Sequence, residues 1–441
     1  MTIPSVLVLW NMDSTIREQR SGGLDAPGSL ALESIEEQLP PPDSTGLGPP
    51  SGVVAVCLCG VFAFLNLYVT QPLLPLFSLV FREPKSVVSS TVSAATLGVA
   101  ISAPILGALA EHLSRKRVIV TSIVVLAIPT LLAATSPGLL TLDAWRFLQG
   151  LILPGIFAIA ITYIGEEWDH HAVPLVMSIY VSGTALGGFL GRIVSGLVAE
   201  HFNWRWSFAL LAVLTLAGAA MVALWLPTET RPMPQGPHPG LITQLGSMLC
   251  HFRNPHLVAT FGVGAGMLFT LVGTFTYITY YLADPPFHLS TAALSYLFAI
   301  YLIGLVVTPA GGYLVTHIGM RAGIAVAICC SLAGVLLTLS HSLWIVVIVG
   351  LGLVCSGVFI AQATANSFLR LAAAPGTRAS AAGLYICCYY LGGTVGGVLP
   401  SYVWELGRWP ACVVLIASVL LVTLFIALTG WKLPRVPRAA A

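Results

Sequence analysis

Charged residues are scarce in this chain of 441 residues. Asp, Glu, Lys and Arg together make up 8% of it, whereas a soluble globular protein carries roughly 25% of such residues. Hydrophobic residues make up 57%, and the mean hydropathy is +0.91. So few charges cannot cover a water-exposed surface of this size. The scarcity excludes an ordinary set of soluble domains and indicates an integral membrane protein.

Several functional motifs are missing as well. The net charge is only +2, which argues against a nucleic-acid partner, because proteins that bind nucleic acid carry a strongly basic surface. None of the nine cysteines forms a Cys-x-x-Cys pair, so neither a zinc site nor a disulfide framework is indicated. We expect no metal and no cofactor. The absence of a Gly-x-x-x-x-Gly-Lys-Ser/Thr segment excludes a pump driven through a Walker A loop. One group of acids and histidines, residues 166–171, is interpreted as a solvated loop, so we expect no enzyme.

Residues 1–52 differ from the rest of the chain. Seven acids and two arginines give this segment a net charge of −5. Low hydrophobicity with net charge predicts a disordered tail, here cytoplasmic. The apolar run 6–10 is too short for a signal peptide and follows no basic segment. Met12 is a second candidate start, and deleting residues 1–50 should leave the function intact.

Twelve apolar runs follow, each long enough to cross about 30 Å of hydrocarbon. The fold class expected is therefore an all-α membrane protein with twelve transmembrane helices. A polar connection divides them into an N-terminal half (53–227), a cytoplasmic linker (228–255) and a C-terminal half (256–432), followed by a cytoplasmic tail (433–441). The runs lie near 53–78, 91–112, 118–135, 139–165, 173–199, 206–227, 256–283, 290–316, 322–340, 342–369, 379–403 and 410–431.

The loops carry an asymmetric charge that sets the orientation. If both termini are cytoplasmic, four basic loop residues lie outside: Arg82, Lys85, Arg205 and Arg408. Thirteen then lie inside: Arg17, Arg20, Arg115, Lys116, Arg117, Arg231, Arg253, Arg321, Arg370, Arg378, Lys432, Arg435 and Arg438. This excess satisfies the positive-inside rule and predicts a multi-pass protein of the cytoplasmic (inner) membrane.

The two halves resemble one another. A shift of 205 residues carries Gly107, Lys116 and Tyr180 onto Gly312, Arg321 and Tyr385, and the glycines at 187, 188 and 191 onto those at 392, 393 and 396. The halves are thus parallel repeats, which can rock against one another around a site at their interface. A secondary transporter in the lipid bilayer, moving a small-molecule substrate, is the natural interpretation.

The sequence resembles the major facilitator superfamily over about residues 53–431. Residues 107–116 (GALAEHLSRK) are similar to the family's helix 2–3 loop, G-x-L-x-D-R-x-G-R-K, with departures at His112 and Ser114. Arg146-x-x-Gln149-Gly150 is similar to its R-x-x-Q-G element, and residues 68–75 (YVTQPLLP) are similar to bacterial arabinose- and drug-efflux permeases. The resemblance implies a latch between the halves in the outward-facing state, formed by Gly107, Glu111, Arg115, Lys116, Gly312 and Arg321.

Three charges within the apolar runs are candidates for binding or coupling. Charges at membrane depth are rare and usually face the bundle interior. Arg146 could face a cavity, or it could neutralise Asp143 three residues earlier or snorkel to the surface. Arg192 could bind an anionic or carboxylated substrate, or it could pair with Asp143. Asp143 is the one acid clearly inside a run, so we expect it to carry the coupling proton.

Polar and aromatic residues could line the substrate path. Amides at this depth face protein or a cavity, and hydrogen bonding between helices is the alternative for each of them. The candidates are Asn66, Tyr68, Gln71, Gln149, Tyr277, Tyr280, Gln362, Asn366 and Tyr389.

Glycines form one cluster in each half. Small residues at a spacing of four let helices approach closely, so both clusters predict close helix packing. Gly187→Leu should therefore stall transport while the protein stays inserted. The clusters consist of Gly183, Gly187, Gly188, Gly191, Gly392, Gly393 and Gly396.

The predicted function is proton-coupled efflux of a small organic solute or drug by a monomer. Efflux and the monomer are what the resemblance implies. The hallmark Gly-Pro of antiporters is missing from residues 182–191. This leaves open a uniporter, or a proton symporter for a sugar or carboxylate. A transport-inactive receptor is the alternative from another class.

Overall fold

The computed structural model describes residues 50–109, 114–169, 171–229, 246, 248–340, 342–343, 345–374 and 377–431. These residues belong to one compact unit, and no strand occurs among them. The all-α fold expected from the sequence is confirmed. Residues 1–49 of the predicted tail, most of the linker and the C-terminal tail lie outside the described residues.

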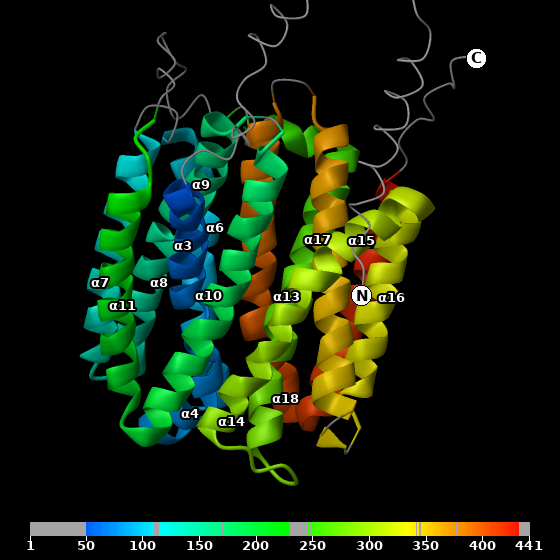
Figure 1. Cartoon of the computed structure of the whole chain (residues 1–441). Helices are drawn as coiled ribbons and strands as arrows, with labels where there is room; N and C mark the ends of the chain where they lie inside the picture. Colours follow the sequence, from blue (N-terminus) through cyan, green and yellow to red (C-terminus); the bar gives the residue numbers. More distant parts are fainter. Residues whose placement is uncertain are drawn as a thin grey trace, which may run out of the picture. The chain divides into compact units, whose positions relative to one another are not determined.

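The N-terminal half contains six helical segments that are long and apolar enough to cross a membrane, and Figure 1 draws them from blue to green. The first consists of α3 (Pro50–Leu67), a short 3₁₀ helix η1 (Gln71–Leu73) and α4 (Leu74–Phe81), and the second of α5 (Lys85–Val88) and α6 (Ser90–Leu109). The others are α7 (Arg115–Ala134), α8 (Leu139–Ile152) with α9 (Pro154–Glu167), α10 (Val173–His201) and α11 (Trp204–Trp225). The fourth span divides at Leu153 because Pro154 has no backbone N–H to continue the helical ladder.

The second half begins after η3 (Cys250–Arg253) with α13 (Pro255–Ala283), whose first turn is capped by the Asn254 side chain. The eighth span combines α14 (Thr291–Tyr296), the 3₁₀ helix η4 (Leu297–Ile303) and α15 (Gly304–Ile318). It is followed by α16 (Met320–Leu337), a π-helical segment η5 (Ile345–Leu351), α17 (Gly352–Ala372) and α18 (Arg378–Gly430).

The last helix contains two of the twelve expected spans. Among the described residues, eleven helical segments are long and apolar enough to cross a membrane. The eleventh, α18, runs for 53 residues but has non-helical backbone at Gly407 and at Arg408, whose φ is 50°. This break lies between the predicted runs 379–403 and 410–431, so α18 accounts for both of them.

The glycine cluster of the first half lies where α10 packs against α3 (Figure 1). A methyl group added at Gly187 would lie 2.1 Å from the Val61 carbonyl oxygen, and one at Gly191 would lie 2.0 Å from that of Leu65. A methyl group at Gly183 would lie 2.3 Å from the Cys57 carbonyl oxygen of α3. These three glycines therefore allow the two backbones to touch. Gly188 departs from the prediction, because its nearest neighbour is Nη1 of Arg192 at 3.2 Å and not a second helix backbone.

The second half repeats this packing between α18 and α13. A methyl group at Gly392 would lie 2.0 Å from the Ala265 carbonyl oxygen, and one at Gly396 would lie 2.5 Å from that of Phe269. Gly393 differs from these two, because a methyl group there would meet the side chain of Leu268 at 2.8 Å instead of a backbone. A flexible side chain can move aside more easily than a helix backbone, so Gly392 and Gly396 restrict this pair more strictly than Gly393 does.

Candidate substrate and coupling site

The first span is interrupted at the depth where the predicted polar residues gather. α3 ends at Leu67, and the Gln71 amide donates to the Tyr68 carbonyl at 3.1 Å instead of continuing the α-helical ladder. Pro72 then has no N–H to donate. The interruption releases carbonyl groups at the end of α3 and turns Tyr68 and Gln71 towards the other helices. Discontinuous helices of this kind often form sites in transporters.

Arg146 on α8 binds the released carbonyls. Its Nη1 donates to the Asn66 carbonyl at 2.7 Å, and its Nη2 donates to the Leu67 carbonyl. Its Nε donates to the Thr91 carbonyl at 3.2 Å, and Nη1 also donates to the Gln149 side chain. The side chain is completely buried. Each of these acceptors belongs to the first half, so Arg146 joins α8 to α3 and α6.

A hydrogen-bonded network of side chains continues from Arg146. Gln149 donates to the Thr130 hydroxyl at 2.9 Å, and Thr130 donates to the Asn66 side-chain oxygen at 3.1 Å. Asn66 in turn donates to Thr215 at 3.0 Å. These are the hydrogen bonds between helices that the sequence left open for Asn66 and Gln149. They occur within the first half.

Asp143 is not paired with either buried arginine. The ion pairs found among the described residues are Lys85–Asp284 and Arg115–Glu166. Asp143 Oδ2 instead accepts a hydrogen bond of 2.5 Å from the Ser90 hydroxyl, and its buried Oδ1 has no hydrogen-bond partner.

The segment that carries Ser90 also crosses to the second half. The Ser89 hydroxyl lies 3.0 Å from that of Tyr277, and Lys85 Nζ lies 2.9 Å from Asp284 Oδ2. Lys85 Nζ also lies 4.5 Å from the ring centroid of Trp404. We call Lys85, Ser89, Tyr277, Asp284 and Trp404 the outer seal, because these residues lie at the ends of the spans that are expected to face outward.

Arg192 on α10 lies between the halves, about 13 Å along the helix from His201. Its Nε donates to the Gln71 side-chain oxygen at 2.8 Å, and its Nη1 donates to the Gly188 carbonyl at 2.6 Å. The guanidinium carbon lies within 5 Å of three ring centroids, at 4.8 Å from Tyr68, 4.7 Å from Phe298 and 4.5 Å from Tyr301. We call Arg192, Tyr68, Gln71, Phe298 and Tyr301 the Arg192 cage.

The other predicted residues lie on α13, α17 and α18 in the second half. Tyr277 belongs to the outer seal, and the Tyr280 ring lies 5.1 Å from Lys85 Nζ. Tyr389 is buried on α18. Gln362 is half-buried and Asn366 is exposed on α17, and neither takes part in the hydrogen bonds of the cage or of the Arg146 network.

The sequence did not reveal several residues of the Arg192 cage and of the segment that forms the outer seal. Phe298 and Tyr301 lie in an apolar run that carries no polar marker. Ser89 and Ser90 are common residues at a helix start, and nothing in their spacing indicates a partner. Thr276, which accepts a hydrogen bond of 3.3 Å from Gln71, follows Gln71 by the repeat distance of 205 residues. That shift was the one signal that could have found it.

Three of the latch residues bond within their own half or to the start of the linker. Arg115 forms an ion pair of 3.1 Å with Glu166, and the Lys116 amide donates to Glu229 at 2.9 Å. Arg321 donates to the Leu428 carbonyl at 2.5 Å. Glu111 lies outside the described residues. The latch role that the resemblance implies for these residues stays a prediction.

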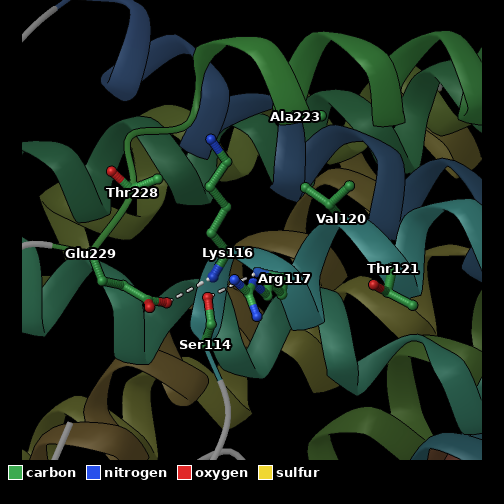
Figure 2. A pocket seen from close by; sticks show the side chains of 8 residues that line it. All are labelled: Ser114, Lys116, Arg117, Val120, Thr121, Ala223, Thr228 and Glu229. Atoms are coloured by element: carbon green, nitrogen blue, oxygen red, sulfur yellow. Dashed lines mark hydrogen bonds between the residues drawn. The ribbon is translucent and has the colours of Figure 1, made fainter.

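A cavity of about 600 Å³ opens beside the start of α7 and the end of α11. Figure 2 shows Ser114 and Glu229 beside the first turn of α7, where the dashed lines mark their bonds to backbone amides. The other lining residues are Lys116, Arg117, Val120, Thr121, Ala223 and Thr228. All eight belong to the first half or its junction with the linker, so this cavity is separate from the Arg192 cage.

Proteins of known family are similar to this chain in sequence and in fold. A sequence profile of the Major Facilitator Superfamily matches residues 56–397. The MFS-type transporter YybF of Bacillus subtilis (strain 168) is 31% identical over 368 residues, which cover 83% of this chain and 90% of that protein. The inner membrane transport protein YnfM of Escherichia coli (strain K12) is 31% identical over 382 residues, 87% of this chain and 90% of that protein. A solved structure of the peptide transporter POT in complex with sulfate has a TM-score of 0.72 at 15% identity, covers 90% of this chain and 97% of that one, and shares the fold.

Proposed function

The chain belongs to the Major Facilitator Superfamily and is a multi-span membrane transporter, not an enzyme, and from this premise we propose that it exports a small organic solute in exchange for protons. It works as a monomer in the bacterial cytoplasmic membrane, with both termini in the cytoplasm. Its two six-helix halves, joined by the cytoplasmic linker, rock around the Arg192 cage.

The observation that carries this proposal is the set of polar contacts that join the two halves among the described residues. The outer seal joins them at one end of the spans, and near it Glu200 accepts a 2.5 Å hydrogen bond from the Ala292 amide. At the opposite end, residues 110–113 and 230–245 lie outside the described part of the chain, and the Arg115–Glu166 pair and the Arg321 bond to Leu428 each stay within one half. With the expected orientation, this arrangement supports an inward-facing state. A carrier that alternates must open one end while it closes the other.

Proton coupling is assigned to Asp143 because this carboxyl lies next to the outer seal. Its Oδ2 accepts a hydrogen bond from the Ser90 hydroxyl, and the hydroxyl of the adjacent Ser89 contacts that of Tyr277 across the interface. An ionised carboxylate only accepts hydrogen bonds, whereas a protonated one also donates. A proton on Asp143 therefore changes the bond that positions Ser90, and with it the segment that carries Ser89 and Lys85. Proton binding is thereby linked to opening of the outer end.

Asp143→Asn is expected to uncouple transport from protons, because an amide cannot gain or lose the proton. The protein is reconstituted in liposomes that contain a pH-sensitive dye, and a proton gradient is imposed. Cationic drugs, sugars and carboxylates are then added one at a time. We consider a solute whose addition makes the wild-type liposomes release protons. Liposomes with the variant should release at least tenfold fewer protons on the same addition, while labelled solute still exchanges across the membrane.

Glu83→Gln is the matched control, since Glu83 is an exposed acid near the same end of the bundle. It should behave like the wild type. Full proton release by Asp143→Asn would contradict the assignment. Solute equilibration by the wild type without proton movement would indicate a uniporter, and the absence of any flux would indicate a transport-inactive receptor.

A further inference from the structure

The guanidinium of Arg192 has a donor group that the protein does not use. Its Nε and Nη1 bind Gln71 and the Gly188 carbonyl, whereas the buried Nη2 has no hydrogen-bond partner. Arg192 as a whole is 1% exposed. Buried polar groups are nearly always hydrogen-bonded, so an unpartnered guanidinium nitrogen needs an explanation. Arg146, equally buried, gives the contrast, because both of its Nη atoms donate to protein oxygens.

The positive charge of Arg192 also has no carboxylate beside it. Neither ion pair found among the described residues includes it. Its neighbours are instead the rings of Tyr68, Phe298 and Tyr301. Ring faces attract a cation, but they do not accept the hydrogen bond of Nη2 as a charged oxygen would. A buried charge without a counter-ion is unfavourable, and an anion that enters with the solute would supply the missing partner.

Both halves contribute to the cage. Tyr68 and Gln71 come from the interrupted first span, and Phe298 and Tyr301 come from η4 in the eighth. Side chains three residues apart eclipse one another in a 3₁₀ helix, so Phe298 and Tyr301 present their rings on one face. Gln71 also donates to Thr276 in the second half. A solute bound here contacts the elements that must separate during alternation.

We propose that Arg192 binds the carboxylate of the transported solute, with Nη2 donating to a carboxylate oxygen and the three rings of the cage enclosing the apolar body of the solute. This assignment rests on the proposed transport function and narrows its substrate class to organic monocarboxylates. The one free nitrogen and the apolar surroundings suit a single negative charge. A phosphate dianion would require further cationic donors, and the neighbouring Arg146 is already bound to backbone carbonyls.

Binding is tested on purified protein in detergent, separately from transport. The probes are acetate, benzoate, 1-naphthoate and decanoate, together with the matching neutral amides and inorganic phosphate. We expect at least one apolar monocarboxylate to raise the unfolding temperature of the wild type in a saturable way, while its amide and phosphate do not. In Arg192→Gln, the affinity for that carboxylate should fall at least tenfold.

Arg205→Gln is the matched control, because Arg205 donates to backbone carbonyls at the outer end of α11, away from the cage. It should bind the carboxylate as the wild type does. Arg192→Lys replaces Arg192→Gln as the test variant if the glutamine variant fails to fold. It keeps the charge but not the planar donor set, so the affinity should still fall.

Two results would overturn the proposal: equal binding of acid and amide by the wild type, or carboxylate binding that survives both Arg192 variants. Failure of every carboxylate in the panel to bind would overturn it as well. The transport function is judged apart from this. Proton-linked flux of a cationic drug without carboxylate binding refutes the Arg192 assignment alone. Arg192-dependent binding without flux of any solute refutes transport alone.

Discussion

An Arg146→Lys transporter is expected to unfold far more easily than the wild type, although it keeps the positive charge. The guanidinium of Arg146 bonds three backbone carbonyls on α3 and α6 as well as Gln149. The lysine ammonium is a compact point charge and does not reach around this set. Each bond from a charged donor contributes about 1.5–3 kcal/mol. Losing two or more of them should cost on the order of 3–6 kcal/mol, a large part of a typical folding free energy.

The measurement is the unfolding midpoint in detergent, together with the fraction of protein that elutes as a single species. Arg82→Lys is the control, because Arg82 is exposed at the C-terminal end of α4 and should tolerate the change. If Arg146→Lys is as stable as the wild type, the carbonyls at the end of α3 have other partners, and the role assigned to Arg146 is wrong.

Gly187→Leu should give a protein that inserts normally but transports about a hundredfold more slowly. The added carbon would meet the Val61 carbonyl oxygen at 2.1 Å, and both groups belong to helix backbones that cannot move aside locally. The α3–α10 pair must therefore separate. Overpacking costs typically 1–3 kcal/mol, and a cost near 3 kcal/mol in the barrier to alternation corresponds to about a hundredfold in rate. Insertion survives because leucine is more apolar than glycine.

Initial rates of labelled solute exchange in proteoliposomes, normalised to the amount of inserted protein, give the comparison. Gly392→Leu should act like Gly187→Leu, because the repeat places Gly392 equally close to the Ala265 carbonyl. Gly165→Ala should be silent, since nothing lies within 4 Å of the position where its methyl group would be. Normal rates in both leucine variants would show that these helix pairs loosen at no cost.

The helices were predictable from the sequence because a span needs only apolar residues of sufficient number. The repeat and the glycine clusters were also visible, since a spacing of four residues returns to the same helix face. Arg146 and Arg192, in contrast, look alike in sequence. What separates them is the interruption of the first span, which supplies carbonyls to Arg146 and leaves Arg192 with the side chain of Gln71.

The remaining parts of the site depend on tertiary contacts. Phe298 and Tyr301 become cage residues because η4 packs against α10 and places both rings beside Arg192. Their spacing of three residues puts them on one helix face, but an apolar run gives no sign of which neighbour that face meets. Asp143 was expected within reach of an arginine from its spacing, but its partner is Ser90, more than fifty residues earlier in the chain. Sequence spacing alone gives no sign of such a partner.

The position of the Lys85–Asp284 pair has a consequence for the effect of external salt. Both side chains are partly exposed, 26% and 39%, at the end of the bundle that is expected to face the surroundings of the cell. Dissolved ions weaken exposed charge pairs, since the Debye length falls from about 30 Å at 0.01 M to about 8 Å at 0.15 M. Higher ionic strength outside the cell should therefore weaken this contact between the halves, and lower ionic strength should strengthen it. In the proposed cycle, external salt would thus act on the ease with which the halves part at this end.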